Sequence, residues 1–180
     1  MDETTGNKSD RQGDGAWTAE VEQLLQDWRN RTYAAQSGHY IMTERLKRWN
    51  YLLGVPVVVA TSIVGTTIFA SLGQNVGLPV RVAAGIVSIM AAVLSGLQTF
   101  FNFAKTATLH TAAAAWYSAI RRDIEALLAL PPDMRGDPKA SLDPIRKEMN
   151  KVAQSSPELS ERLWVGLAQR FKVDEPPLGG

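Results

Sequence analysis

Cysteine is absent from this chain of 180 residues, and histidine occurs only twice. The lack of cysteine excludes disulfides, thiolate metal sites and a cysteine nucleophile. The two histidines, His39 and His110, are far apart in the sequence, and neither has neighbours at metal-ligand spacing. No G-x-S-x-G sequence, phosphate-binding glycine loop or pair of carboxylates in an apolar setting occurs. The sequence therefore predicts neither an enzyme nor a cofactor, and it indicates no catalytic or metal-binding residue.

Charged residues are also missing from the middle of the chain. Between Arg48 and Lys105 the only one is Arg81. This part contains the apolar runs 51–72 and 82–104, which a loop of nine residues separates. A helix needs about 20 apolar residues to cross a hydrocarbon core about 30 Å thick, and both runs have that length. Lipid offers no hydrogen-bond partners to backbone N–H and C=O groups, and a helix satisfies these groups internally. The pattern therefore predicts two helices in a transmembrane hairpin.

A buried pair of helices in a soluble protein is the alternative. Soluble helices keep a charged stripe because one face meets water. The polar residues within the two runs are only Thr, Ser, Gln and Asn, which membrane helices tolerate. The composition therefore favours membrane-spanning helices. The mean hydropathy of the whole chain is near zero because polar flanks offset the two runs.

Basic residues determine the expected orientation. Cations beside a span stay on the cytoplasmic side, and Trp and Tyr settle at the headgroup level. The connecting loop offers only Arg81, whereas the flanks carry Arg45, Lys47, Arg48, Trp49 and Tyr51 before the first run and Lys105, Arg121 and Arg122 after the second. We expect a multi-pass protein of the cell inner membrane with both termini in the cytoplasm. Since about fifty polar residues precede the first run, that run should act as an uncleaved insertion signal.

Before the first run, composition predicts a disordered tail over 1–16, which cannot bury enough apolar surface to become ordered. A cytoplasmic or interfacial segment, 17–50, follows. Within it a helix is expected from Trp17 to Gln36, with Thr18 as its cap and Ser37-Gly38 weakening or ending it. The predicted apolar face of this helix consists of Trp17, Val21, Leu24, Leu25, Trp28 and Ala35.

After the second run, we expect one helix to continue from about Val82 to Leu130, where Pro131-Pro132 stops it. Its predicted apolar stripe is Leu109, Ala113, Trp116, Ile120, Ile124 and Leu127. Asp143-Pro144 and Ser156-Pro157 each look like a cap followed by proline at the first helical position, so two short helices should follow. The segment 105–171 is thus expected to form cytoplasmic helices and 172–180 a flexible tail. Within the first run, Pro56 is expected to kink the helix.

These apolar stripes should pack together, within one chain or between chains. The predicted fold class is an all-α membrane protein, in which a two-transmembrane helical hairpin (51–72 and 82–104, together 51–104) continues through its second span into a cytoplasmic helical bundle.

Two patterns on the second run are candidates for function. A helix-packing ridge of small residues recurs at every fourth position, at Ala84, Ser88, Ala92 and Gly96. Such ridges let helices approach closely in lipid, and the partner is either the first run, through Thr61 and Gly65, or another subunit. An overlapping polar stripe supplies the pore-lining candidates Ser88, Ser95, Thr99, Asn102 and, at the inner mouth, Lys105. This stripe either lines a water-filled path or makes interhelical hydrogen bonds.

The order of these features resembles the SLATT family, the two-transmembrane effector domain that associates with SMODS and SLOG proteins in bacterial conflict systems. The likeness covers about residues 17–170. It rests on the paired runs and on the sequences RTYAAQSGHY, ERLKRWN and KTATLHTAAAAWYSAIRRDIEALL. The positions most similar to the family are Tyr33 and the cytoplasmic helix candidates His110, Trp116, Tyr117, Arg121 and Arg122. The resemblance implies a membrane effector that opens or disrupts the inner membrane when an infection or nucleotide signal is sensed, with a separate sensor or nucleotide-signalling protein as partner.

We therefore expect an oligomeric pore-forming or membrane-disrupting effector of antiphage defence, triggered through its cytoplasmic helices. Two helices cannot enclose a channel, so a pore requires a homo-oligomer, a tetramer or larger. The expected partners are the lipid bilayer and further copies of the chain. The net charge of +1 does not suggest a nucleic acid. The alternative is a non-conducting membrane scaffold that tethers a cytoplasmic partner through its apolar surface.

Overall fold

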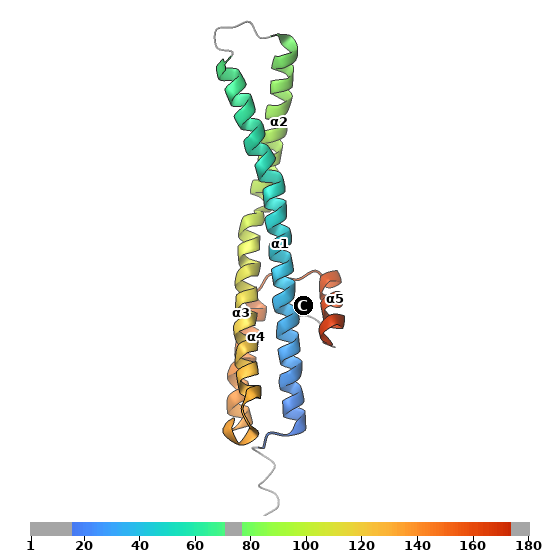
Figure 1. The fold of residues 1–180 in the computed structure, drawn as a ribbon, viewed down its shortest axis with the longest axis vertical. Coiled ribbons are helices and arrows are strands. Elements are labelled where there is room, and N and C mark those ends of the chain that lie inside the picture. Colours follow the sequence, from blue (N-terminus) through green and yellow to red (C-terminus); the bar gives the residue numbers. More distant parts are fainter. Residues whose placement is uncertain (1–15, 71–76, 174–180) are drawn as a thin grey trace, which may run out of the picture. The chain divides into compact units, whose positions relative to one another are not determined.

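The computed structural model describes residues 16–70 and 77–173, and this part of the chain is helical without any strand. The elements are α1 (Ala19–Ala70), α2 (Leu78–Phe101), α3 (Phe103–Ala129), the 3₁₀ helix η1 (Pro132–Met134), α4 (Pro138–Ser155) and α5 (Glu161–Phe171) (Figure 1). Residues 1–15, 71–76 and 174–180, which hold most of the two predicted tails and part of the connecting loop, lie outside the described residues. By length and composition, Ala19–Phe69 and Leu78–Ala129 could each cross a membrane.

Ser37-Gly38 was expected to weaken or end the first helix. Helix α1 runs through both residues without interruption, so the second alternative, an end there, is wrong. Gly38 is buried, and a Cβ at this position would lie 2.7 Å from Cδ1 of Leu159 and 3.0 Å from Cδ1 of Leu167. A glycine inside a helix costs about 1 kcal/mol relative to alanine. Here the missing side chain admits two leucines against the backbone, so tertiary packing outweighs the local preference. Pro56 also lies inside α1 without ending it.

The expected single helix from Val82 to Leu130 is interrupted at Asn102, so the prediction of one continuous helix is wrong. Asn102 adopts the left-handed conformation, with φ 45° and ψ 45°, and its N–H donates to the carbonyl of Gln98 at 3.1 Å. Asparagine enters this region more readily than other residues with a side chain. The predicted stop before Pro131-Pro132 is confirmed, because α3 ends at Ala129.

The start of α4 lies earlier than predicted. Asp137 is its N-cap, and the carboxylate accepts from the backbone N–H of Ala140 at 2.8 Å. Pro138 follows in the first turn, where its missing N–H costs nothing. The chain thus uses the earlier of two Asp-Pro pairs, and Asp143-Pro144 lies inside the helix. Helix α5 is displaced in the opposite direction, because its N-cap is Ser160, which lies after the predicted Ser156. Ser156 is instead the C-cap of α4.

Contacts divide the chain into two units, Met1–Tyr40 with Thr111–Gly180 as the first and Ile41–His110 as the second. The core of the first unit draws side chains from α1, α3, α4 and α5. It consists of Leu25, Ala34, Ala35, Tyr117, Ile120, Ile124, Met149, Val152, Trp164 and Leu167. The apolar stripes expected to pack together therefore do so within one chain.

Two of the predicted helix faces are partly wrong. On α3, Leu109 and Trp116 are exposed, while the buried face instead includes Tyr117. On α1, Leu24 is exposed and the polar residue Thr32 is fully buried. Thr32 lies one heptad after the buried Leu25, so the inward stripe follows heptad spacing with a polar residue in it. Its hydroxyl donates to the carbonyl of Trp28 at 2.9 Å, which satisfies it inside the helix.

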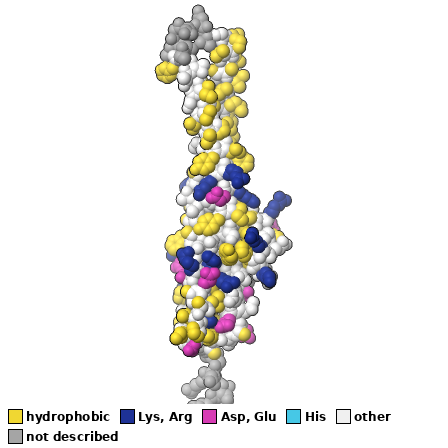
Figure 2. Space-filling view, in the orientation of Figure 1, with side chains coloured by type: hydrophobic (Ala, Val, Ile, Leu, Met, Phe, Trp, Pro, Cys, Tyr) yellow, Lys and Arg dark blue, Asp and Glu magenta, His cyan; other side chains and the backbone are white. Residues whose placement is uncertain are grey.

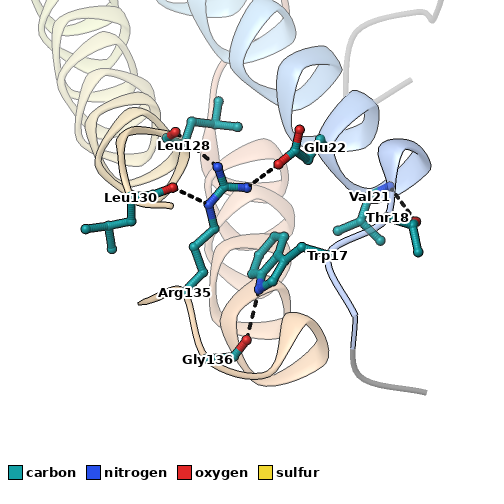
Figure 3. Close-up of polar contacts among 8 residues, drawn as sticks. All are labelled: Trp17, Thr18, Val21, Glu22, Leu128, Leu130, Arg135 and Gly136. Atoms are coloured by element: carbon teal, nitrogen blue, oxygen red, sulfur yellow. Dashed lines mark hydrogen bonds and ion pairs between the residues drawn. The ribbon is translucent and has the colours of Figure 1, made fainter. Parts of the chain in front are cut away.

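Arg135 joins the loop after α3 to the start of α1 (Figure 3). Its Nε donates to the carbonyl of Leu130 at 2.7 Å and its Nη2 to that of Leu128 at 3.3 Å. These carbonyls lie at the C-terminal end of α3, where helix carbonyls lack intrahelical partners. Nη1 of Arg135 pairs with the Glu22 carboxylate at 2.8 Å, and the guanidinium lies over the Trp17 ring at 5.2 Å. One side chain therefore holds three parts of the first unit together.

Candidate functional site

Apolar side chains on α1 and α2 face outward. In the most apolar 18 residues of α1 none is buried, and in those of Leu78–Ala129 the buried share is 6%. On the face drawn in Figure 2, the side chains over α2 and the adjoining part of α1 are hydrophobic or uncharged. Soluble monomers rarely expose an apolar patch larger than a few hundred Å². A surface of this kind is typical of helices that contact lipid or further protein.

Within the second unit, the contact between α1 and α2 is built on one amide pair and one glycine. Gln98 Nε2 donates to Asn50 Oδ1 at 3.1 Å. A Cβ at Gly54 would lie 2.9 Å from the same Gln98 nitrogen, so glycine lets the amide cross the α1 backbone. Ala91, one heptad before Gln98, is the buried residue of α2. The sequence analysis missed this contact, although Asn50 and Gln98 are amides near the inner ends of the two runs.

The predicted packing ridge borders α1 only in part. Ala84 lines an apolar groove of about 470 Å³ together with α1 residues from Pro56 to Thr67. Ser88 and Ala92 line a second groove, of about 410 Å³. A Cβ at Gly96 would meet nothing within 4 Å. A four-residue repeat turns by about 40° around a helix at each step, so the ridge leaves the contact face before Gly96.

The predicted partner residues on the first run lie beside this second groove. Thr61 and Gly65 line it from α1, opposite Ser88, Ala92 and Ser95 of α2. A Cβ at Gly65 would also meet nothing within 4 Å. The two runs thus face each other here across a groove, and the small residues leave space there.

The predicted pore-lining residues separate into two groups. Ser88 and Ser95 border the groove with α1, whereas Thr99, Asn102 and Lys105 do not border it and are exposed. Hydroxyl groups of the stripe are satisfied inside their own helix, since Ser88 donates to the carbonyl of Ala84 at 2.8 Å and Thr99 to that of Ser95 at 3.0 Å. Such hydroxyls can face water, lipid or another helix without losing their hydrogen bonds.

In the first unit, the cytoplasmic helix candidate Tyr117 is buried between α1 and α3. Its ring stacks on that of His39, with centroids 5.6 Å apart and planes at 15°. Burial raises the pKa of the Tyr117 hydroxyl, and a hydrogen bond with Ser156 and the positive charge of Arg31 oppose that rise. The sequence analysis named Tyr117 but not His39 as a candidate. The heptad spacing from Leu25 through Thr32 to His39 could have indicated it.

Arg121 lies against Tyr33, and the sequence analysis singled out each of these two residues separately. Its guanidinium is 4.8 Å from the centre of the Tyr33 ring, and Nη1 pairs with Glu125 at 3.3 Å. Phe171 at the end of α5 packs on Tyr33 with centroids 4.6 Å apart. Nε of Arg121 is buried without a hydrogen-bond partner. These contacts connect α1, α3 and α5.

The remaining cytoplasmic candidates differ in burial. Trp116 is 56% exposed. Arg122 is exposed and donates to Ser118 on its own helix at 3.0 Å. His110, in the second unit, is 2% exposed, and burial lowers the pKa of its imidazole. The structure therefore groups Tyr117 and Arg121 with buried contacts and leaves Trp116 and Arg122 on the surface.

Among residues 16–70 and 77–173, no group of three or more His, Asp or Glu side chains is arranged to hold a metal ion. The arrangement offers two apolar helices joined by an amide contact, and a helical core in which Tyr117 stacks on His39 and the Arg121 guanidinium lies over Tyr33. Comparison of the chain with protein-family models, curated proteins and solved structures finds no match.

Proposed function

We propose that this protein is an oligomeric effector of the bacterial inner membrane that forms a pore or disrupts the bilayer in antiphage conflict. The observation that carries this proposal is the outward-facing apolar surface of α1 and α2, of which almost nothing is buried. Burying such a surface in lipid is favourable by about 25 cal/mol per Å². The membrane-spanning hairpin is the arrangement that removes it from water.

The orientation follows from charge. Arg45, Lys47 and Arg48 precede the first span and Lys105 follows the second, so both termini lie in the cytoplasm. The helices of the first unit then lie in the cytoplasm, where they receive the trigger. The resemblance to the SLATT family supports this assignment and points to a separate sensor or nucleotide-signalling protein.

The pore arises between subunits, because two helices cannot enclose a channel. The stripe containing Ser95 and Thr99 supplies polar groups at helical spacing on α2. Because Thr99 already donates within its helix, facing water or a neighbouring helix costs little. We infer a homo-oligomer of four or more copies with these residues around the opening.

Dye release from liposomes tests the proposal. Purified full-length chain, reconstituted at increasing protein-to-lipid ratios, should release a small trapped dye. Ser95→Leu should reduce release at least tenfold, because it places a bulky apolar group on the polar stripe. Val93→Leu is the matched control, since position 93 lies about 160° around the helix from position 95, and it should release dye like the unaltered chain.

Vesicles that stay tight at every protein-to-lipid ratio would contradict the pore. Equal loss of release in Ser95→Leu and Val93→Leu would exclude the stripe as its lining. Cross-linking of the same samples reports whether each variant still assembles.

A second candidate is a non-conducting scaffold that tethers a cytoplasmic partner. An exposed aromatic side chain on α3 favours it, since the indole of Trp116 in the first unit is 56% exposed. In this case Trp116→Ala abolishes cellular activity, and Ser95→Leu and Asn102→Leu leave it intact. The opposite ranking favours conduction. Leu127 is less suitable for this test because it packs on the core of the first unit.

A further inference from the structure

A shallow depression of about 540 Å³ lies on α1 just before its apolar run. The residues that line it are Glu44, Lys47, Arg48, Tyr51 and Leu52. Their spacings of three, one, three and one place them on one face of the helix. All five belong to the second unit and to one uninterrupted helix, so their relative positions are set by helix geometry alone.

The polar end of the depression is suited to an anion. Lys47 and Arg48 provide two cations and Glu44 one anion, and all three side chains are exposed. Lys47 Nζ is 3.7 Å from Glu44 Oε1, but an exposed pair of this kind contributes little to stability. The ammonium group can therefore exchange this carboxylate for a phosphate at small cost. Tyr51 adds a phenolic hydroxyl, which can donate a further hydrogen bond.

The other end of the depression is apolar and continues along the same face. Leu52 lines it, and Val55 and Val58 follow Tyr51 at spacings of four and three. Both valines are exposed, at 56% and 64%. Ten residues separate Arg48 from Val58, which corresponds to about 15 Å along the helix. The basic end of the depression thus continues into an apolar track, formed by Leu52, Val55 and Val58, that is about as long as an acyl chain.

We propose that this face of α1 binds an anionic phospholipid, with its phosphate at Lys47 and Arg48 and an acyl chain along Val55 and Val58. The proposal rests on the proposed insertion of α1 in the membrane. A free phosphate or a nucleotide would use the cations but not the apolar track. A zwitterionic lipid would bring a choline group that the two cations repel.

Lipid binding to the full-length chain in detergent micelles tests this site. Native mass spectrometry counts phosphatidylglycerol and phosphatidylcholine molecules bound at matched concentrations, and phosphatidylglycerol should bind more tightly. Arg48→Gln should weaken its binding about fivefold, the effect expected for one cation at an anionic surface. Glu44→Gln should strengthen binding, because it removes the only opposing charge that lines the depression.

Arg45→Gln is the matched control. Arg45 carries the same charge on the same exposed stretch of α1 but does not line the depression. It should change phosphatidylglycerol binding less than twofold. Equal losses in Arg45→Gln and Arg48→Gln would overturn the site and leave only a general attraction between cations and anionic lipid.

Further outcomes separate the possible sources of phosphate and the two proposals. If millimolar inorganic phosphate displaces phosphatidylglycerol, the site recognises free phosphate and the lipid assignment fails. If the chain co-sediments with vesicles but binds both lipids equally, the lipid site fails and the membrane proposal stands. If the chain does not co-sediment with vesicles at all, both proposals fail.

Discussion

Replacing Arg135 by methionine should destabilise the first unit by about 2 kcal/mol, a typical large value for one substitution. Methionine keeps most of the aliphatic stem but removes all of the polar contacts. The guanidinium side chain is only 6% exposed, and it bonds two carbonyls at the end of α3 and the carboxylate of Glu22. Losing these contacts leaves the end of α3 without its partner.

The magnitude follows from two opposing effects. Hydrogen bonds from a charged donor contribute about 1.5–3 kcal/mol each, so the two carbonyl contacts of Arg135 are worth about 3–6 kcal/mol. Burying a guanidinium costs several kcal/mol, and the substitution removes that cost. Leu130 is exposed, so water can reach part of the freed backbone. The net loss is therefore about 2 kcal/mol rather than the sum of the contacts.

Two further variants make this value testable. Glu22→Gln should cost at most about 1 kcal/mol, because Glu22 is 43% exposed and water replaces its partner. Arg146→Met breaks an exposed pair with Asp143, 3.0 Å long, and should cost less than about 0.5 kcal/mol. The double variant at positions 22 and 135 should cost less than the sum of the single ones, because both lose the same contact.

Denaturant unfolding of the full-length chain in detergent, followed by far-UV circular dichroism, measures these differences. Hydrogen exchange should quicken first at the end of α3 and in the following loop in Arg135→Met. A cost for Arg135→Met no larger than for Arg146→Met would refute the reasoning, because burial would then make no difference to the strength of the contact.

Three further predictions concern other contacts. Burial lowers the pKa of His110 below the ordinary histidine value of 6.5, so the folded chain should lose stability as the pH falls below that value. His110→Gln should reduce this loss, measured by thermal unfolding at about pH 7.5 and about pH 5.5. Gly38→Leu should displace α5, because its side chain would occupy the space of Leu159; hydrogen exchange in α5 should rise at least tenfold, and unchanged exchange would contradict the close contact. Gln98→Leu removes the hydrogen bond to Asn50 and should lower stability in micelles by about 0.6 kcal/mol, the average for such bonds between membrane helices; a loss above about 2 kcal/mol would mean that the amide does more than this bond.

Some local signals in the sequence allowed more than one structure, and only packing decided between them. Asp137-Pro138 and Asp143-Pro144 have the same capping chemistry, yet α4 begins at the first pair, where Pro138 is buried. Gly38 looked like a helix end because glycine disfavours helices, but two leucines need its open side. Each choice depends on residues far away in the sequence, which a local pattern does not contain.

For the candidate residues, too, packing decided what the local pattern could not. Trp116 and Tyr117 are adjacent on α3, and the apolar spacing favoured the tryptophan as the inward residue. The structure buries Tyr117 because His39 stacks on it and Ser156 binds its hydroxyl. Polar partners of this kind are invisible to a search for apolar stripes. The contact of Gln98 with Asn50 was missed because it is also polar, and because it joins residues 48 positions apart.

The sequence by itself determined that the chain has two helices long and apolar enough to span a membrane, because the absence of charge over two runs of about 20 residues is a property of composition and needs no partner. It also determined the helical state and the stop at Pro131-Pro132, since proline acts on its own backbone and on the preceding turn. Only the tertiary structure decided which side of each helix is buried and which cap is used. These outcomes depend on contacts between distant residues, and a contact of that kind outweighs local preferences of about 1 kcal/mol.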